Sequence, residues 1–453
     1  MPDTAGIRGA VEEFRRRHDI PGISLCTFTS AGPALTVATG HASVRSGAQP
    51  VTPKTRFRIY SITKMMTGTV AAALAADGAV DLDAPVDYYL PELAAWNRQS
   101  RRSVTLRLLL SHQAGLPPDA LTRRAMSRDA DGLRAAVLHD VPRLPRLAEP
   151  GQVYSYSSIA ISLAGFVLER ATGMRFRSLI RDRLLEPLGM AITTHDPEEA
   201  MSGPHAQHHL TTAGGRLRVA HDARLGIRYE TSSLCYSTPA DIARFGAAHL
   251  GGAHQVVPEA ALAQLRHRHA DLRLDVDMSY GLTCYRTRLQ DGRLLFGHEG
   301  FFAGMWAKLI IDPERDFGVV WMDNRGDELR EQRYALLTRL FGVPGQTACG
   351  LGATSAQADA VEVEGRYERA ADDGLQVRPL GDGLGVTDGD RCVSLDQDHP
   401  GLWVSRYRLG PGEAPWGPHA GSQRICLSLT RSAAGGVSFV HLNGLPYRRV
   451  TAA

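Results

Sequence analysis

The chain has 453 residues, of which 43% are hydrophobic and 22% are charged, values typical of a folded protein of about two domains. Its formal net charge is only +3, and no run of five lysines or arginines occurs, which argues against a nucleic-acid-binding protein. The first residues lack the basic and apolar pattern of a secretory signal, and no apolar stretch approaches the about 18 residues of a membrane span. We therefore expect a cytoplasmic protein without membrane or nucleic-acid partners.

Apolar patterns along the first 340 positions predict both helices and strands. Helical spacing predicts helices at residues 6–18, 61–76, 104–111, 158–171 and 328–340. Short apolar runs predict a hairpin at 23–29 and 34–39, then strands at 280–288, 293–297, 305–311 and 318–322. This order favours an α+β fold, in which an antiparallel sheet is flanked by helices and accompanied by an all-helical region.

The composition changes at residues 344–360, which are rich in Gly, Ala, Ser and Thr and contain few large apolar side chains. Such a stretch is typical of a linker. After it, residues 361–453 contain short apolar runs between frequent Gly and Asp turns, which favours a small all-β domain, such as a barrel. We therefore expect a first domain at 1–343, a linker at 344–360 and a β domain at 361–453.

Six cysteines lie far apart in the sequence, and no Cys-x-x-Cys pair occurs. This density is too low for a disulfide scaffold, so we expect buried, reduced thiols.

Ser61 and Lys64 stand three positions apart at the start of the predicted helix 61–76. Positions i and i+3 share one helix face, so the hydroxyl and the amine can meet. A serine hydroxyl is a poor nucleophile until a base takes its proton, and a partly buried lysine near other cations can be that base. Unpaired amides at the helix N-terminus also suit an oxyanion. The pattern predicts a nucleophile at Ser61 and a proton acceptor at Lys64.

Lysine is rare in this chain: Lys54, Lys64 and Lys308 are three of the 51 basic residues. Arginine does not lose its proton in proteins and cannot serve as a general base. A lysine in so arginine-rich a chain therefore points towards chemistry, although Lys54 and Lys308 also fit ordinary surface positions.

Ser-x-x-Lys alone is weak evidence, because a helix-capping serine followed by a solvated lysine has the same spacing. Two further motifs follow it, Tyr156-Ser157-Ser158 before an apolar helix and His298-Glu299-Gly300 between apolar runs. Together they resemble the Ser-x-x-Lys, Tyr-x-Asn and Lys-Thr-Gly or His-x-Gly motifs of the serine β-lactamase and penicillin-binding-protein superfamily. Flanking residues 104–116, 236–243 and 279–282 are similar as well, and the resemblance covers residues 6–342.

The resemblance implies a role for each motif. Ser61 would form an acyl-enzyme, and Lys64 would accept its proton. Tyr156 would pass a proton to the leaving group or prepare the incoming nucleophile, which requires cationic neighbours for a phenol with a pKa near ~10. The backbone amides of Ser61 and Phe301 would form the oxyanion hole. His298 would replace the lysine of the Lys-Thr-Gly forms and tune Tyr156 or steer a carboxylate.

One position departs from the family pattern, because Ser158 stands where the second motif usually has Asn. A shorter hydroxyl puts tight binding of a β-lactam or D-Ala-D-Ala amide in doubt. We predict that the substrate-binding residues are Ser158, Gly300, Phe302 and, in the β domain, Arg449. For Arg449 and its neighbour Arg448, a surface or interdomain ion pair is the structural alternative to a clamp on a substrate carboxylate.

Several residues have a plain structural alternative. Tyr154 competes with Tyr156, but the spacing to the following apolar helix favours Tyr156. His112 fits a hydrogen-bonding role better than a catalytic one. The histidines at 205, 208 and 209 lie close in sequence without a nearby cluster of Cys or carboxylate residues. We expect neither a metal nor a cofactor.

The motifs define the acyl transfer but not the substrate. The layout, a catalytic domain followed by a small β domain, resembles the penicillin-binding-protein-type thioesterases that release and cyclise non-ribosomal peptides and carry a lipocalin-like domain. The expected partner is a small-molecule or peptidyl acyl donor, and this layout favours a peptide carried as a thioester on a carrier protein. Two alternatives are a cytoplasmic esterase, D-amino-acid peptidase or β-lactamase-like hydrolase, and a non-catalytic sensor on the same fold.

Overall fold

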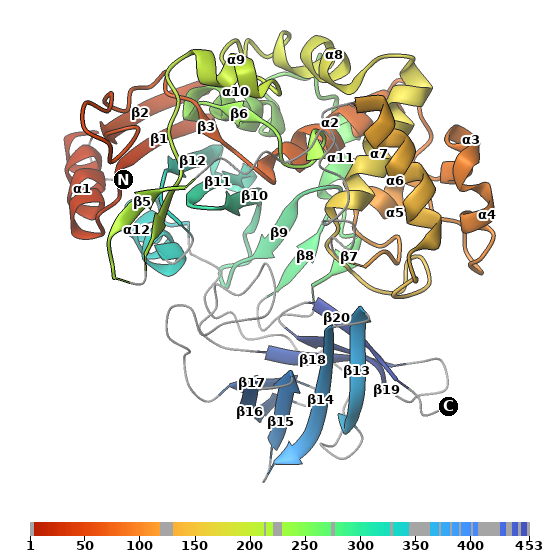
Figure 1. Cartoon of the computed structure of the whole chain (residues 1–453). Coiled ribbons are helices and arrows are strands. Elements are labelled where there is room, and N and C mark those ends of the chain that lie inside the picture. Colours follow the sequence, from red (N-terminus) through yellow and green to blue (C-terminus); the bar gives the residue numbers. More distant parts are fainter. Residues whose placement is uncertain are drawn as a thin grey trace.

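A computed structural model describes most of the chain. The described residues are 4–117, 130–212, 214–220, 229–272, 277–326, 329–343, 363–370, 373–380, 383–388, 391–399, 402–405, 426–431, 437–442 and 445–450. The first six ranges form a sheet with helices around it, and the later ranges form a barrel (Figure 1). The predicted linker at 344–360 lies outside the described residues.

An antiparallel sheet of eight strands is the centre of the larger part (Figure 1). Its spatial order is β2 (Gly32–Gly40), β1 (Gly22–Thr29), β12 (Phe317–Asp323), β11 (Met305–Asp312), β10 (Leu294–Phe302), β9 (Tyr285–Arg288), β8 (Met278–Tyr280) and β7 (Ala270–Asp271). Neighbouring strands pair in register, with Gly300 of β10 opposite Ala307 of β11. The predicted hairpin is present as β1 and β2, and the predicted α+β class is confirmed.

Side chains of alternate strand residues enter two separate cores, as the period-2 geometry of a strand requires. On β12, Val319 and Trp321 face the core covered by α1 (Thr4–Arg17) and α12 (Arg330–Phe341). Val320 and Met322 face the opposite core. The helices that cover this second face are α2 (Ile62–Ala76), α10 (Pro239–His249) and α11 (Glu259–Arg266) (Figure 1).

The remaining helices and two small sheets complete the larger part. The helices are α3 (Val86–Tyr89), α4 (Ala94–Asn97), α5 (Leu106–Leu110), α6 (Ala130–Asp140), α7 (Ser158–Thr172), α8 (Phe176–Ile180) and α9 (Pro197–Ser202), with single turns at Pro91–Leu93, Val141–Arg143, Arg181–Leu185 and Pro313–Arg315. The small sheets pair β3 (Phe57–Arg58) with β6 (Tyr236–Ser237) and β4 (His209–Thr211) with β5 (Leu217–Val219).

Helix ends follow the capping rules of their residues. Ser157 precedes α7 and accepts a hydrogen bond from the amide of Ala160 at 3.4 Å, and Gly173 ends the helix with a left-handed φ of 69°. Thr238 caps α10 by accepting from the amide of Asp241. These caps place the second motif, at 156–158, at the start of a buried helix.

One predicted strand, 280–288, is wrong. The structure divides it into β8 and β9, which form a hairpin, because Thr283 takes a left-handed φ of 59° between them. Conversely, the strand predicted at 293–297 continues to Phe302, so the third motif lies inside β10.

Eight strands of the later ranges form a closed antiparallel barrel (Figure 1). They are β13 (Gly365–Ala370), β14 (Asp373–Leu380), β15 (Gly383–Asp388), β16 (Arg391–His399), β17 (Leu402–Ser405), β18 (Cys426–Arg431), β19 (Val437–Leu442) and β20 (Leu445–Arg449). Tyr367, Val386 and Tyr447 belong to its own buried core. Phe439 of β19 instead packs against Ala148 and Val153 of the larger part.

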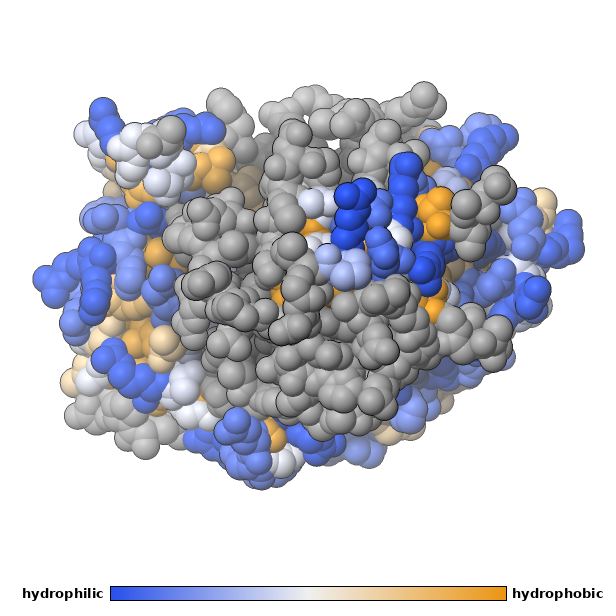
Figure 2. All heavy atoms as spheres, turned by 90° about the horizontal axis from the view of Figure 1, so that it is seen from below, coloured by the Kyte–Doolittle hydropathy of each residue, from blue (hydrophilic) through white to orange (hydrophobic). Residues whose placement is uncertain are grey.

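Seen from the barrel side, the described surface is mostly hydrophilic with small hydrophobic patches (Figure 2). None of the helices in the described part of the chain combines the length and hydropathy needed to cross a membrane. Cys26, Cys235 and Cys284 are buried and free of disulfides, as expected.

Candidate active site

Ser61 and Lys64 meet at the start of α2. Lys64 Nζ donates a hydrogen bond to Ser61 Oγ at 3.0 Å, and the lysine side chain is fully buried. Ser61 occupies the N-cap position, but its side chain makes no capping hydrogen bond. A capping serine with a solvated lysine, the structural alternative for this spacing, therefore does not describe the site.

A second contact fixes the amine. Lys64 Nζ also donates to the backbone carbonyl of Ser232 at 3.1 Å, and the carbonyl of Thr231 accepts from Thr67 Oγ1, one turn further along α2, at 2.6 Å. The segment 231–232 thus runs along α2, and its contact with Lys64 Nζ holds the amine beside Ser61 Oγ. No side-chain pattern indicates this segment, because its two contacts with α2 are made by backbone carbonyls.

The backbone before Ser61 is held in an unusual conformation. Tyr60 has a φ of 44°, a left-handed value that is rare for a bulky side chain. Its hydroxyl is 2.7 Å from Nε2 of His208, and its ring makes an edge contact with Phe302. The neighbouring amide of Ile59 donates to the carbonyl of Cys235 at 2.9 Å. Contacts on both sides therefore determine how Ser61 enters the helix.

Strand β10 touches this same backbone. A Cβ added at Gly300 would lie 2.0 Å from the carbonyl oxygen of Ile59 and 2.8 Å from the amide nitrogen of Ser61. Only glycine allows so close an approach. The third motif thus lies against the nucleophile, which places the strand that carries the Phe301 amide beside Ser61.

Tyr156 lies over the lysine. Lys64 Nζ is 4.8 Å from the centroid of the Tyr156 ring, a cation–π distance. The imidazole of His112 lies against the other side of the motif, 4.5 Å from the Tyr156 ring, and its Nδ1 accepts from the amide of Ser157 at 3.1 Å. His112 thus has a hydrogen-bonding role, in agreement with its structural interpretation.

Tyr154 is more deeply buried than Tyr156, which packs against the edge of the same aromatic cluster. It is buried in a cluster with Tyr280 and Leu272, and burial raises the pKa of its hydroxyl well above the ordinary value. Tyr156 is the tyrosine of the pair that contacts Lys64, as its spacing in the sequence indicated.

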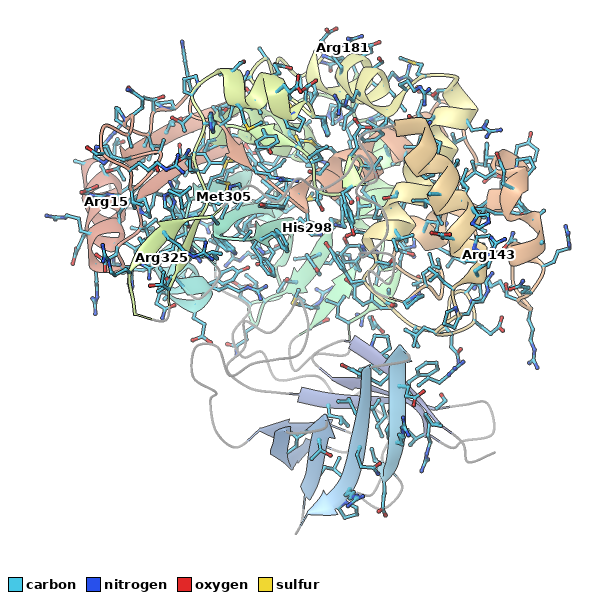
Figure 3. All side chains as sticks on the ribbon, in the orientation of Figure 1. Arg15, Arg143, Arg181, His298, Met305 and Arg325 are labelled. Carbon is cyan, nitrogen blue, oxygen red and sulfur yellow. The ribbon has the colours of Figure 1, made fainter. Side chains whose placement is uncertain are left out.

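His298 faces the same cluster from β10, near the middle of the molecule (Figure 3). Its Nε2 is 3.1 Å from the hydroxyl of Tyr280, and its Nδ1 is 2.6 Å from the carbonyl of Glu299. The rings of Tyr285 and Tyr156 lie 4.7 Å and 6.3 Å from the imidazole. The structure therefore brings the four residues predicted to be catalytic into one continuous cluster.

The predicted substrate-binding residues are more dispersed. Ser158 begins α7 and is 6% exposed, whereas Phe302 at the end of β10 is 48% exposed. Arg449 lies on β20, where it donates to the carbonyl of Glu364 at 2.6 Å. It lines a pocket of about 610 Å³ between the barrel and residues 146–152. No described contact joins it to Ser61, so its role remains a prediction.

Several residues around the site were not predicted. They are Ser232, which holds Lys64, the aromatic neighbours Tyr280 and Tyr285 of His298, and Arg330, which binds Glu299 from behind the sheet. Tyr280 belongs to the family-like stretch 279–282, which is the one signal that could have drawn attention to it. Lys308 was assigned a surface alternative, but it is 6% exposed and lies directly opposite Glu299.

The close-set histidines serve separate contacts. His208 binds the Tyr60 hydroxyl, whereas His209 accepts from the amide of Val44 and contacts the carbonyl of Asn324. His205 contacts the carbonyl of Gly203. Within the described ranges, no three His, Cys, Asp or Glu side chains gather as a metal site requires.

Comparison with known proteins agrees with this geometry. The family model described as Beta-lactamase matches residues 7–341, which include all three motifs. The chain belongs to the beta-lactamase family. It is therefore a serine hydrolase of the superfamily that also contains the penicillin-binding proteins.

Three similar proteins extend the comparison. Penicillin-binding protein 4 of Amycolatopsis lactamdurans is 28% identical over 396 residues, which cover 82% of this chain and 99% of that protein. The unguisins hydrolase ungD' of Aspergillus campestris (strain IBT 28561) is 27% identical over 69% of this chain and 60% of that protein. The crystal structure of SurE covers 99% of both chains at 26% identity with a TM-score of 0.78, and a structure of SurE with D-Leu gives 0.76.

Proposed function

We propose that this hydrolase transfers an acyl group through an ester on Ser61 and that its physiological reaction is the release and macrocyclisation of a non-ribosomal peptide thioester. The hydrogen bond of 3.0 Å from Lys64 Nζ to Ser61 Oγ, inside a buried cluster, is the observation that carries the first half. The pair has the geometry of a nucleophile and its base.

The first step follows from these contacts. An uncharged Lys64 takes the proton of Ser61 as Oγ attacks the acyl carbon. Complete burial of the side chain disfavours the charged form and so lowers the cost of the neutral amine, while the carbonyl of Ser232 accepts one of its hydrogens and orients the nitrogen. The developing oxyanion would be bound by the amides of Ser61 and Phe301.

Tyr156 would complete proton transfer. From its place over Lys64 it can pass the lysine's proton to the sulfur of the leaving thiol. In the second step it can take a proton from the incoming amine and deliver it to Ser61 Oγ as the ester bond breaks. His298 lies near enough to influence Tyr156, and the phenols of Tyr280 and Tyr285 hold it in place. No metal or cofactor is needed for either step.

The choice between ring closure and hydrolysis depends on water. A cyclase holds the peptide's own amine beside the ester, and the effective concentration of that amine then favours the ring. Phe302 and the barrel-side residue Arg449 are proposed contacts of the acyl donor. The similarity to SurE spans both the larger part and the barrel, which supports treating the two as one functional unit in this proposal.

A decisive experiment offers the enzyme linear peptidyl N-acetylcysteamine thioesters with a free N-terminal amine, ending in D-Leu or L-Leu. The D-Leu series is included because SurE has been crystallised with that amino acid. We expect a product with the mass of the ring, absent with Ser61→Ala. Product at the mass of the linear acid alone, at both chiralities, would count against cyclisation.

Hydrolysis is the second candidate function. The unguisins hydrolase, which is 27% identical over 69% of this chain, favours it. A second substrate distinguishes the two: a cyclic peptide would be opened by a hydrolase and left intact by a dedicated cyclase, and mass spectrometry of the products reports which occurs.

A further inference from the structure

Strand β10 has two faces with different partners. Gly300 lies against Ile59 and Ser61, as the contacts of an added Cβ show. Because side chains alternate along a strand, Glu299 and Phe301 point to the opposite face, towards α12. The position of β10 relative to Ser61 therefore depends on what holds these two side chains.

One guanidinium holds both. Arg330 at the start of α12 binds the Glu299 carboxylate with two nitrogens: Nη2 contacts Oε1, and Nε donates to Oε2 at 3.1 Å. Its carbon Cζ also lies 5.9 Å from the centroid of the Phe301 ring. Arg330 thus contacts the side chains of both residues that flank Gly300.

The pair is almost completely buried. The side chains of Arg330 and Glu299 are 7% and 4% exposed, and the hydroxyl of Tyr334 donates to the same carboxylate at 3.1 Å. Burying such a pair often gives no stability beyond what apolar residues of the same size would give. The bidentate geometry of the pair does, however, fix the distance and angle between α12 and β10 more tightly than apolar packing can.

We propose that Arg330, acting through Glu299, is a positioning residue for the oxyanion hole. It determines how far Gly300 and the Phe301 amide of β10 lie from Ser61. The inference rests on the proposed function, in which that amide binds the oxyanion. Oxyanion donors act only within a narrow distance of the developing charge, so a small shift of β10 slows acylation.

The chain contains a matched control. Arg333, one turn further along α12, binds Asp323 of β12 through two bonds of 2.7 Å, and both side chains are fully buried. This pair joins the same helix to the same sheet, but through β12, which β11 separates from β10. Glu299→Gln and Asp323→Asn therefore make the same chemical change at two buried ion pairs of the same helix.

The experiment measures acylation by p-nitrophenyl acetate, binding of phenylboronic acid and the urea midpoint of unfolding. The boronate forms a tetrahedral adduct with a serine and places an oxygen in the oxyanion hole. We expect Glu299→Gln and Arg330→Lys to lower the acylation rate constant and the boronate affinity about 10–100-fold, with KM within about threefold. Asp323→Asn should lower the urea midpoint as much or more, with acylation within about twofold of wild type.

Equal loss of acylation in Asp323→Asn, or unchanged boronate affinity in Glu299→Gln and Arg330→Lys, would overturn the positioning role. If the single variants do not fold, the double variant Glu299→Gln/Arg330→Met removes both charges and keeps the packing, and the same loss of boronate affinity is expected. A wild-type enzyme that takes up no acyl group at Ser61 would refute the proposed function itself, and this inference with it.

Discussion

Lys64 and the carbonyl of Ser232 are 168 positions apart in the sequence, yet a hydrogen bond of 3.1 Å joins them. The lysine thus has two partners, one that it is proposed to activate and one that holds it in place. This arrangement explains how a long, flexible side chain keeps a fixed direction while buried.

The proposed base can be tested by replacing it with residues that cannot accept the proton. We expect Lys64→Ala and Lys64→Arg to lower the acylation rate about 10³-fold, because arginine keeps its proton and alanine has none to exchange. Stopped-flow release of p-nitrophenol measures the effect. Lys54→Ala, at an exposed lysine, should retain full activity. Wild-type rates in Lys64→Arg would refute the assignment.

The two tyrosines of the second motif region should differ sharply. Tyr156→Phe should reduce turnover about 10²–10⁴-fold, since it removes the hydroxyl proposed to transfer protons while keeping the ring that lies 4.8 Å from Lys64 Nζ. Tyr154→Phe should leave turnover nearly unchanged, because burial keeps that hydroxyl protonated. Steady-state kinetics of both variants show which tyrosine transfers protons. A larger loss in Tyr154→Phe than in Tyr156→Phe would assign that role to Tyr154.

Gly300 should tolerate no side chain. In Gly300→Ala the new methyl meets the Ile59 carbonyl at 2.0 Å, so β10 or the Ser61 backbone must move, and we expect acylation to fall about 10²-fold. Gly9→Ala is the control: the added Cβ meets nothing within 4 Å on α1, and helix propensity should raise stability by about 0.5–1 kcal/mol. The rate at which a fluorophosphonate labels Ser61 measures the loss of acylation in Gly300→Ala. Urea unfolding measures the stability of Gly9→Ala. Undiminished labelling of Gly300→Ala would contradict the close approach.

The family pattern has Asn where this chain has Ser158. Ser158→Asn should restore the amide side chain of the family pattern at the start of α7 and raise the rate of acylation by benzylpenicillin about tenfold, the effect of one or two neutral hydrogen bonds. Intact-protein mass spectrometry follows the adduct. If the rate does not increase, the second motif does not limit β-lactam recognition.

Stability should fall in mild acid. Burial, followed by the charge of Arg266, lowers the pKa of His249 to about 3. In the unfolded chain the histidine has a pKa of about 6.5. Between pH ~6.5 and pH ~3 the unfolded chain therefore binds a proton that the folded protein does not. The stability contributed by neutral His249 is thus full above pH ~6.5 and is lost progressively as the pH falls towards about 3. By pH 5 this single residue should cost about 2 kcal/mol.

Urea unfolding at pH 7, 6 and 5 measures this slope. His249→Gln should flatten it by about one proton, whereas His254→Gln, at an exposed histidine, should leave it unchanged. An unaltered slope in His249→Gln would contradict the burial of a neutral imidazole.

Much of the fold and the cluster of motif residues could be predicted from local patterns. The helix predicted at 61–76 is α2, and the tight spacing of Ser61 and Lys64 needs only a helix to bring them together. The spacing from Tyr156 to the apolar run that forms α7 favoured it over Tyr154, and its ring is the one that contacts Lys64.

What escaped prediction depends on strand register and on backbone atoms. Lys308 is buried because β11 places it opposite Glu299, and no pattern within β11 alone shows which strand lies beside it. The partnership of Arg330 with Glu299 needs α12 to lie on the back of the sheet, a fact of tertiary structure. The break at Thr283 also could not be read from an apolar run that continues through it.

Phe439 of β19 is 2% exposed and fits against Ala148 and Val153, a few positions before Tyr156. This contact constrains how such enzymes diversify. A substitution within residues 148–153 that admits a new acyl donor must also keep the apolar contact with the phenyl ring of Phe439. Otherwise it must be accompanied by a change on β19. Changes in the barrel and in the loop before Tyr156 are therefore coupled, and grafting one without the other would leave Ala148, Val153 or Phe439 as an uncovered apolar patch.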